Sequence, residues 1–148
     1  MAIQTTYSET LVAGVVGQLA DTAEVTCISR TVQAATLAFG VPVNQGTADG
    51  QCRLFTTGDT VTSFIGVSVR DRSVTEGDTY TQYESARVMR EGVIWVTASV
   101  QVAAGDPVAV TAAGEWGNVA GTNGIVVPNA RFETSTTGTG KIAKISIC

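Results

Sequence analysis

Apolar and polar side chains alternate most regularly between residues 93 and 102. One face carries Ile94, Val96, Ala98, Val100 and Val102, and the other carries Trp95, Thr97, Ser99 and Gln101. A period of two predicts a half-buried strand, because successive side chains of a strand point to opposite sides. Residues 90–92 predict a tight turn before it. The alternation restarts over residues 107–111 after Gly105 and Asp106, which predicts an antiparallel strand–turn–strand unit.

Shorter apolar runs separated by turn residues continue this pattern along most of the chain. They predict strands over residues 25–32, 37–43, 52–56, 64–69, 125–128, 131–134 and 141–147. Pro42 lacks a backbone N–H, so its strand is expected to be an edge or to bend there. Residues 81–91 fit either a helix capped by Gly92 or a strand pairing back on residues 93–102, and we favour the strand. The pattern predicts one all-β domain over residues 25–148, a β-sandwich, a jelly-roll-like fold or a small barrel.

Residues 1–24 fit neither the helical nor the strand period. The apolar residues of this segment are interrupted by glycines, which predicts an extended N-terminal arm. Its alternative is an unstructured terminus. Several exposed apolar side chains would be costly in water, so we favour an arm ordered against a partner. The expected contact residues in the arm are Tyr7, Leu11, Val12, Val15, Val16 and Leu19.

Composition narrows the classes of function. Only 15% of the 148 residues are charged and the net charge is −4, so no basic stripe is available for nucleic acid. No apolar run reaches the roughly 18 residues of a membrane span, and no signal peptide is apparent. Three widely spaced cysteines are unlike a disulfide framework. Cys27 and Cys52 are expected to be buried and Cys148 exposed, in a chain kept in a reducing cytoplasm.

Residues for catalysis or metal binding are scarce. The chain has no histidine, which excludes catalysis by a His base and most zinc sites. Thr139, Gly140 and Lys141 fail the phosphate-loop pattern, because Ser135 and Ile142 occupy two of its required positions. The neighbouring carboxylate pairs, Glu84 with Glu91 and Glu76 with Asp78, are expected to be solvated turn residues. We therefore expect no enzyme activity, no cofactor and no metal.

The two tryptophans are the largest candidates for contacts. Trp95 lies on the face opposite Ile94, where it packs in a second core layer or lies at an interface; we favour the core. Trp116 lies in a glycine-rich loop and is the better contact candidate, while Tyr80 and Tyr83 are weaker ones.

Short motifs in a fixed order resemble a known family. The motifs are Gly14–Asp21 (GVVGQLAD), Phe39–Val43 (FGVPV), Phe64–Val67 (FIGV), Glu91–Val96 (EGVIWV), Ala104–Val108 (AGDPV), Ala130–Thr134 (ARFET) and Gly140–Ala143 (GKIA). In this order they resemble the structural cement, or head decoration, proteins of tailed bacteriophages. Residues 84–91 depart from the pattern, being longer and more charged than the resemblance implies.

The resemblance implies a β-sandwich or jelly-roll-like fold, a homo-oligomer (dimer or trimer) and no enzyme activity. It also implies a place on the outer surface of the capsid, after assembly in the bacterial cytoplasm, with the major capsid protein as partner. The arm would then bridge neighbouring capsid subunits and stabilise the DNA-filled head. Deleting residues 2–20 is expected to abolish capsid binding and to leave the fold intact.

A different class of function remains open from the residues themselves. β-Sandwiches also serve as surface-displayed modules that bind a carbohydrate or a host surface. Trp116 and the loop of residues 112–124 would then form the site, and a sugar would quench tryptophan fluorescence.

Overall fold

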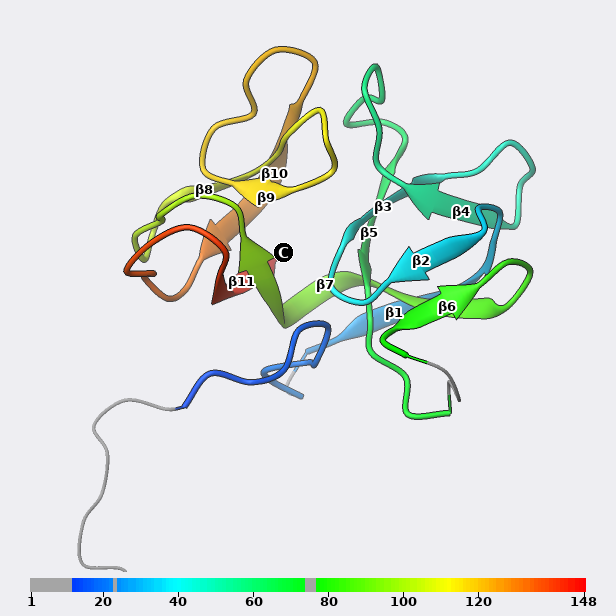
Figure 1. Ribbon diagram of the computed structural model, residues 1–148, viewed down its shortest axis with the longest axis horizontal. Helices are drawn as coiled ribbons and strands as arrows, with labels where there is room; N and C mark the ends of the chain where they lie inside the picture. The colour runs from blue at the N-terminus through cyan, green and yellow to red at the C-terminus, as the bar shows by residue number, and fades with distance from the viewer. Residues whose placement is uncertain (1–11, 23, 74–76) are drawn as a thin grey trace, which may run out of the picture.

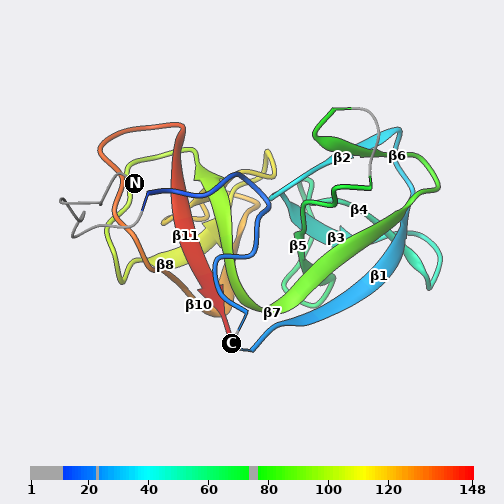
Figure 2. The same cartoon turned by 90° about the horizontal axis from the view of Figure 1, so that it is seen from below.

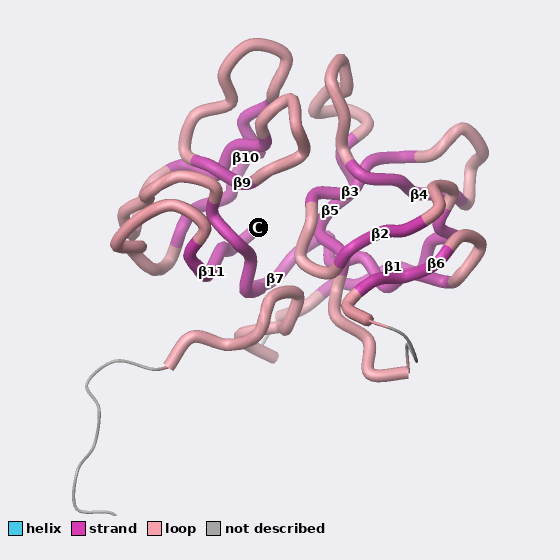
Figure 3. Tube along the Cα trace, viewed as in Figure 1, coloured by secondary structure: helices cyan, strands magenta, loops and turns pink. Residues whose placement is uncertain are grey.

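The computed structural model describes residues 12–22, 24–73 and 77–148, and within these ranges it contains strands and loops but no helix (Figure 3). The all-β prediction is confirmed. The strands are β1 (Thr26–Val32), β2 (Thr36–Ala38), β3 (Pro42–Gln45), β4 (Gln51–Leu54), β5 (Phe64–Ser68), β6 (Thr79–Thr81), β7 (Ser85–Ala98), β8 (Pro107–Val110), β9 (Trp116–Gly117), β10 (Ile125–Phe132) and β11 (Lys141–Ile147).

The main sheet closes on itself twice, and both closures share β7. The order β1-β4-β3-β5-β7 returns to β1 because β7 also pairs with β1; we call this ring the first barrel. The order β7-β11-β10-β8-β9 returns to β7 through the pairing of Ala98 with Trp116; we call it the second barrel. The two barrels lie side by side on the right and left of Figure 1, and Figure 2 shows β7 crossing from one to the other. Of the predicted architectures, the barrel is the one observed.

Strand β7 is continuous through the predicted turn at residues 90–92, so that turn is wrong. Its first half pairs with β1 and β5, and its second half pairs with β11. Gly92 has a φ of 134°, a conformation that side-chain-bearing residues rarely adopt. Arg90 is an extra residue opposite β1, where the register shifts between Thr26 and Cys27. An extra residue of this kind forms a β-bulge, which bends and twists its strand. The bend allows β7 to belong to both barrels.

Residues 81–91 contain a strand, as we favoured, but its partners are not the expected ones. The segment does not fold back on residues 93–102, because residues 85–98 form the single strand β7. The predicted antiparallel unit of residues 93–102 with 107–111 is also wrong: β8 pairs with β10 and β9. Turn residues mark where a strand stops, but they do not choose its neighbour in a closed sheet.

Three further boundaries differ from the predictions. Residues 37–43 bend at Gly40, with a φ of 71°, into β2 and β3, as Pro42 suggested. The pieces expected at 125–128 and 131–134 form the single strand β10, which contains a left-handed Asn129. Strand β6 was not predicted; it pairs with β2 beside the first barrel, with the Phe39 and Tyr80 rings edge to face.

Each barrel has its own buried core. The core of the first barrel includes Val32, Val43, Cys52, Ala86 and Val88. The larger core fills the second barrel and the junction, with Ile94, Val96 and Ala98 fully buried on the inward face of β7. The alternation that predicted this strand therefore gave its inward face correctly up to Ala98.

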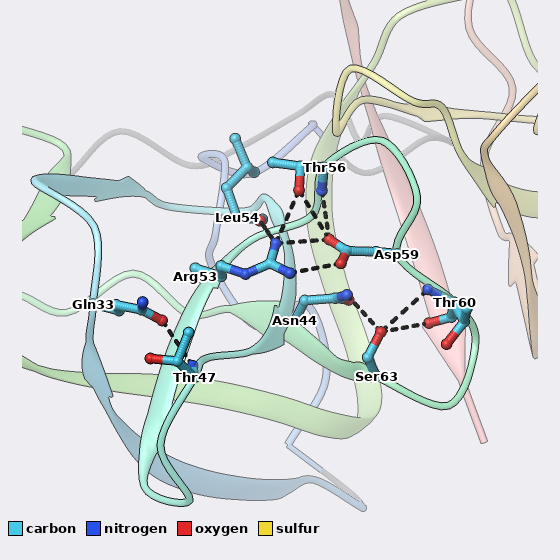
Figure 4. Close-up of polar contacts among 9 residues, drawn as sticks. All are labelled: Gln33, Asn44, Thr47, Arg53, Leu54, Thr56, Asp59, Thr60 and Ser63. Atoms are coloured by element: carbon cyan, nitrogen blue, oxygen red, sulfur yellow. Dashed lines mark hydrogen bonds and ion pairs between the residues drawn. The ribbon is translucent and has the colours of Figure 1, made fainter.

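A polar cluster fastens the loop between β4 and β5 (Figure 4). The guanidinium of Arg53 donates two hydrogen bonds to the carboxylate of Asp59, at 2.6 and 2.7 Å, and that carboxylate also accepts from the Thr56 amide. Nearby, buried Asn44 donates to the Ser63 hydroxyl at 2.8 Å. Hydrogen bonds from Arg53 hold the pKa of Asp59 below its ordinary value, so this loop is held by an ionised pair.

Candidate contact surface

The described part of the predicted arm lies against its own chain. The amide of Gly17 donates to the carbonyl of Trp95 at 2.8 Å, the amide of Trp95 donates to Gln18, and that of Ala20 donates to Val93. Leu19 pairs with Ile94 as an isolated antiparallel bridge. These bonds cover the edge of β7 between its two barrels, and Figure 2 shows the segment running along this region. An unpaired strand edge can pair with another chain, and the arm covers this edge of β7.

Glycines let the arm approach the junction closely. A Cβ on Gly14 would lie 2.5 Å from the indole of Trp95, so the arm backbone lies directly on that ring. Gly17 has a φ of 80°, and its added Cβ would lie 2.7 Å from the Cβ of Phe39. The carbonyl of Gly17 accepts from the Arg70 amide at 2.7 Å. Residues 14–20 are therefore packed structure, and a deletion reaching residue 20 would remove them.

Trp95 lies in a second packed layer, as we favoured. It is buried beneath the arm, and the ammonium of Lys144 lies 5.9 Å from its ring centroid. That distance suits a cation–π contact. The glycine-rich arm motif and Trp95 thus meet in space, a contact that neither pattern predicted alone.

The predicted arm residues divide into exposed and covered groups. Val12 is 89% exposed and Val15 is 51% exposed, so both are available to a partner. Val16 is partly covered beside Gly40, and Leu19 packs against the core of the second barrel. Tyr7 and Leu11 lie outside the described residues. Val12 and Val15 are therefore the contact candidates that this region retains.

Trp116 is not a surface loop residue, so this prediction needs correction. It forms β9, is only 2% exposed, and donates from Nε1 to the Gly40 carbonyl at 2.7 Å. Phe64 packs edge to face against its ring. An indole held inside its own chain cannot present its face to a capsid or a sugar. This burial left no signal in the sequence, because a strand of two residues is too short to show an alternating pattern.

The remaining chemistry is sparse in the part of the chain that the structure describes. No group of three or more Asp, Glu or Cys side chains there could hold a metal ion, and no helix there could cross a membrane. Glu84 accepts from the Thr81 amide and Glu91 from the Thr26 hydroxyl, so each has a local partner. Cys52 is buried, Cys27 is half-buried and Cys148 is exposed, and none forms a disulfide.

Comparison with known families gives a match along nearly the whole chain. The family model described as "Structural cement protein (E217 gp24/Pam3 gp6)" matches residues 3–147. The chain belongs to this family. No curated protein matches the sequence.

A solved structure supports the same fold for this cement-family chain. A chain of "The capsid of Myoviridae Phage XM1" superposes with a TM-score of 0.75 at 15% identity, covering 99% of this chain and 98% of that one. The double-barrel architecture is therefore also found in a chain of a phage capsid structure. The cement-family protein is a structural protein of the bacteriophage capsid.

Proposed function

We propose that this protein binds the outer surface of a tailed-phage capsid, bridges neighbouring subunits of the major capsid protein and stabilises the DNA-filled head. Family membership over residues 3–147 carries this proposal. The protein acts as a homo-oligomer on heads assembled in the bacterial cytoplasm. It works without catalysis, because cement needs shape and adhesion rather than a reacting group.

The double barrel suits this work. Two closed rings sharing one strand leave few free strand edges, so the scaffold stays rigid while its surface contacts neighbours. Val12 and Val15 stand exposed on the segment that lies along the junction. We assign them to the contact with the major capsid protein. Weak contacts repeated over adjacent subunits hold firmly, because each bound site raises the effective concentration at the next.

Co-sedimentation with mature heads stripped of small surface proteins tests the proposal. The purified full-length chain should bind saturably, and the loaded heads should survive higher temperature and chelator than stripped heads. A chain that stays in the supernatant at every concentration would reject the cement function.

Point substitutions separate the contact residues from the fold. Val12→Asp together with Val15→Asp should weaken head binding about 100-fold, because an unpaired charge is then buried at the contact. Val61→Asp is the matched control, since Val61 is an exposed valine of the first barrel, away from the arm. Unchanged binding by the double variant would remove the arm from the contact. These substitutions replace the deletion of residues 2–20, which would also expose Trp95.

The carbohydrate-binding alternative loses its expected site. Both tryptophans of the chain are buried, one beneath the arm and one in the core of the second barrel. A stacking platform for a sugar needs an accessible aromatic face. Titration with sugars should leave the tryptophan fluorescence unchanged.

A further inference from the structure

One aromatic side chain stands exposed at the outer end of the first barrel. In the part of the chain that the structure describes, Tyr83 is 71% exposed, whereas every other aromatic residue is buried or half-buried. Tyr83 lies in the short turn between β6 and β7. Figures 1 and 2 both show this turn at the end of the first barrel, away from the arm. The ring is therefore open to a partner.

The backbone of Tyr83 has a conformation that bulky residues rarely adopt. Its φ of 67° lies in the left-handed region, where the side chain crowds the following carbonyl oxygen. Elsewhere in the described chain Asn123 and Asn129 occupy this region, and asparagine does so at lower cost. Tyr83 is therefore strained in a turn that asparagine would suit better. Strain of this kind persists at sites that serve a function.

Hydrogen bonds to the neighbouring strands hold the turn in place. The amide of Tyr83 donates to the Val32 carbonyl at 2.8 Å, and the amide of Val32 donates to the Glu84 carbonyl at 2.9 Å. The amide of Gln82 donates to the Ala35 carbonyl at 3.0 Å. Because the backbone beneath the ring is already ordered, little conformational freedom is lost when the ring is bound.

Uncharged polar side chains surround the ring. Thr81, Gln82 and Ser85 are exposed, and the carboxylate of Glu84 already accepts from the Thr81 amide at 2.6 Å. The side-chain amide of Gln82 donates to the Gln33 carbonyl, so it is not free to bind a sugar. An apolar centre with a polar rim is the usual anatomy of a protein interface, and tyrosine is common among the residues that carry most of the binding energy.

The position of the turn suits a second contact with the capsid. Strand β7 runs from Ser85, beside the turn, to Val93 and Trp95, where the arm is bound. At about 3.3 Å per residue, the two regions are up to about 30 Å apart on one rigid strand. A two-fold contact between copies would bring the turn against itself, yet the larger hollows of this surface lie along the arm and at the junction. A symmetric contact therefore offers the ring no hollow.

We propose that Tyr83 is a preformed anchor that inserts into a hollow of a major capsid protein subunit next to the subunit held by the arm. The inference rests on the proposed function and names the second contact that bridging requires. The ring fills the hollow, whereas asparagine at this position would fold better and bind worse. Each contact raises the effective concentration of the other, so both are needed for firm attachment.

Substitutions in the full-length chain test the anchor by co-sedimentation with stripped heads and by chemical denaturation. Tyr83→Asn should lower the affinity for heads about 30-fold, because the ring is lost. It should also raise the denaturation midpoint, because the left-handed strain is relieved. Tyr83→Phe keeps the ring and should bind within about threefold of the wild type. Asn123→Tyr is the matched control: it places the same ring at an exposed left-handed position of the second barrel, so it should lower the midpoint and leave head binding unchanged.

Nitration of tyrosines, located by peptide mass spectrometry, identifies what covers the ring. In the free protein Tyr83 should react and buried Tyr80 should not, and Tyr83 should become protected when the protein is bound to heads. Protection that appears in the free protein as its concentration rises would assign the ring to a second copy and overturn the proposal.

Other results would also overturn it. Wild-type head binding by Tyr83→Asn, or a Tyr83 that stays reactive on heads, would exclude the anchor. Equal losses of binding in the Asn and Phe variants would assign the contact to the hydroxyl group rather than the ring. A Tyr83→Asn variant less stable than the wild type would make Tyr83 a structural residue. Failure of the proposed function gives a different result, since the wild-type chain itself would then stay in the supernatant and the anchor would be rejected with it.

Discussion

The two barrels share a strand and a fold type but differ in the surfaces they offer. Residues 25–91, which form the first barrel, contain thirteen charged side chains, six of them arginines, whereas residues 92–148 contain six charged side chains. Both barrels are closed rings with buried cores, so the number of charged side chains does not decide whether a barrel closes. The difference lies outside the cores. The second barrel therefore presents the less charged surface of the two.

The junction between the barrels belongs to neither. It consists of the bend of β7 at Gly92, the buried Trp95 and the arm that covers it. This region decides how two small barrels become one rigid unit. Substitutions in either barrel, ordered from the largest expected effect to the smallest, test whether the two barrels unfold as one cooperative unit.

Gly66→Ala should destabilise the whole protein most. Gly66 of β5 has a φ of 146°, and its added Cβ would overlap the carbonyl oxygen of Met89 on β7. Strain and displacement of the shared strand should lower the free energy of unfolding by about 3–4 kcal/mol. Chemical denaturation followed by tryptophan fluorescence measures it. Because neither tryptophan belongs to the core of the first barrel, a loss confined to that core would leave their transition unmoved and contradict a single cooperative unit.

Gly50→Ala is the control for that experiment. An added Cβ there meets nothing within 4 Å, and Gly50 lies in a loop of the same barrel. Its unfolding midpoint should stay within about 0.5 kcal/mol of the wild type.

Gly17→Ala should release the arm from the junction. Its left-handed φ of 80° and the 2.7 Å approach to Phe39 leave no room for a methyl group, so we expect a loss of about 2 kcal/mol. Acrylamide should then quench Trp95 more strongly, while Trp116 stays protected in the core. Phenylalanine in place of Trp95 removes the quenchable signal and identifies it. A variant with wild-type quenching would show that the arm is not what covers Trp95.

Arg53→Ala should cost the first barrel about 1–2 kcal/mol at neutral pH, because it leaves Asp59 with a poorly satisfied charge. The hydrogen bonds from Arg53 lower the folded-state pKa of Asp59. Its stabilisation is therefore fully present above the ordinary aspartate pKa of about 4 and is lost as the pH falls through the lowered pKa. Thermal unfolding measured from neutral to acidic pH should show this loss in the wild type and not in Asp59→Asn.

The counterpart in the second barrel is Arg131→Ala. Arg131 is exposed on β10, and its removal should change stability by less than about 0.5 kcal/mol. Equal losses of stability for Arg53→Ala and Arg131→Ala would show that the ion pair of the first barrel stabilises the protein no more than an exposed arginine of the second barrel does.

Thiol labelling should report when the first barrel opens, because Cys52 is buried in its core. Burial raises the pKa of Cys52 to about 11, so its reactive thiolate is scarce at pH 8. An aromatic disulfide reagent should therefore react at once with exposed Cys148, and with Cys52 only as the first barrel unfolds. Cys148→Ser should remove the fast phase, and Cys27→Ser in the same chain leaves Cys52 as the one thiol that can react. Rapid labelling of Cys52 in that variant would mean that the first barrel opens on its own.

The sequence by itself determined the strand content, the inward faces and the absence of histidine chemistry. Alternation placed Ile94, Val96 and Ala98 in the core because burial on one side of a pleat imposes a period of two. The bend at Gly40 before Pro42 was also predictable, since it follows from backbone conformations allowed to these residues. The order of short motifs along the chain was sufficient to indicate the family.

Only the tertiary structure decided which strands are neighbours and which apolar groups are covered. Residues 90–92 contain turn-forming residues, but the pairing of Glu91 with β1 and of Gly92 with β11 keeps the chain extended through them. Trp116 and Val119 lie three residues apart in one glycine-rich stretch, yet the indole is buried and Val119 is 70% exposed. Local pattern records which residues can be buried, whereas burial depends on strands distant in sequence. The closure of two barrels around one shared strand is such a non-local fact.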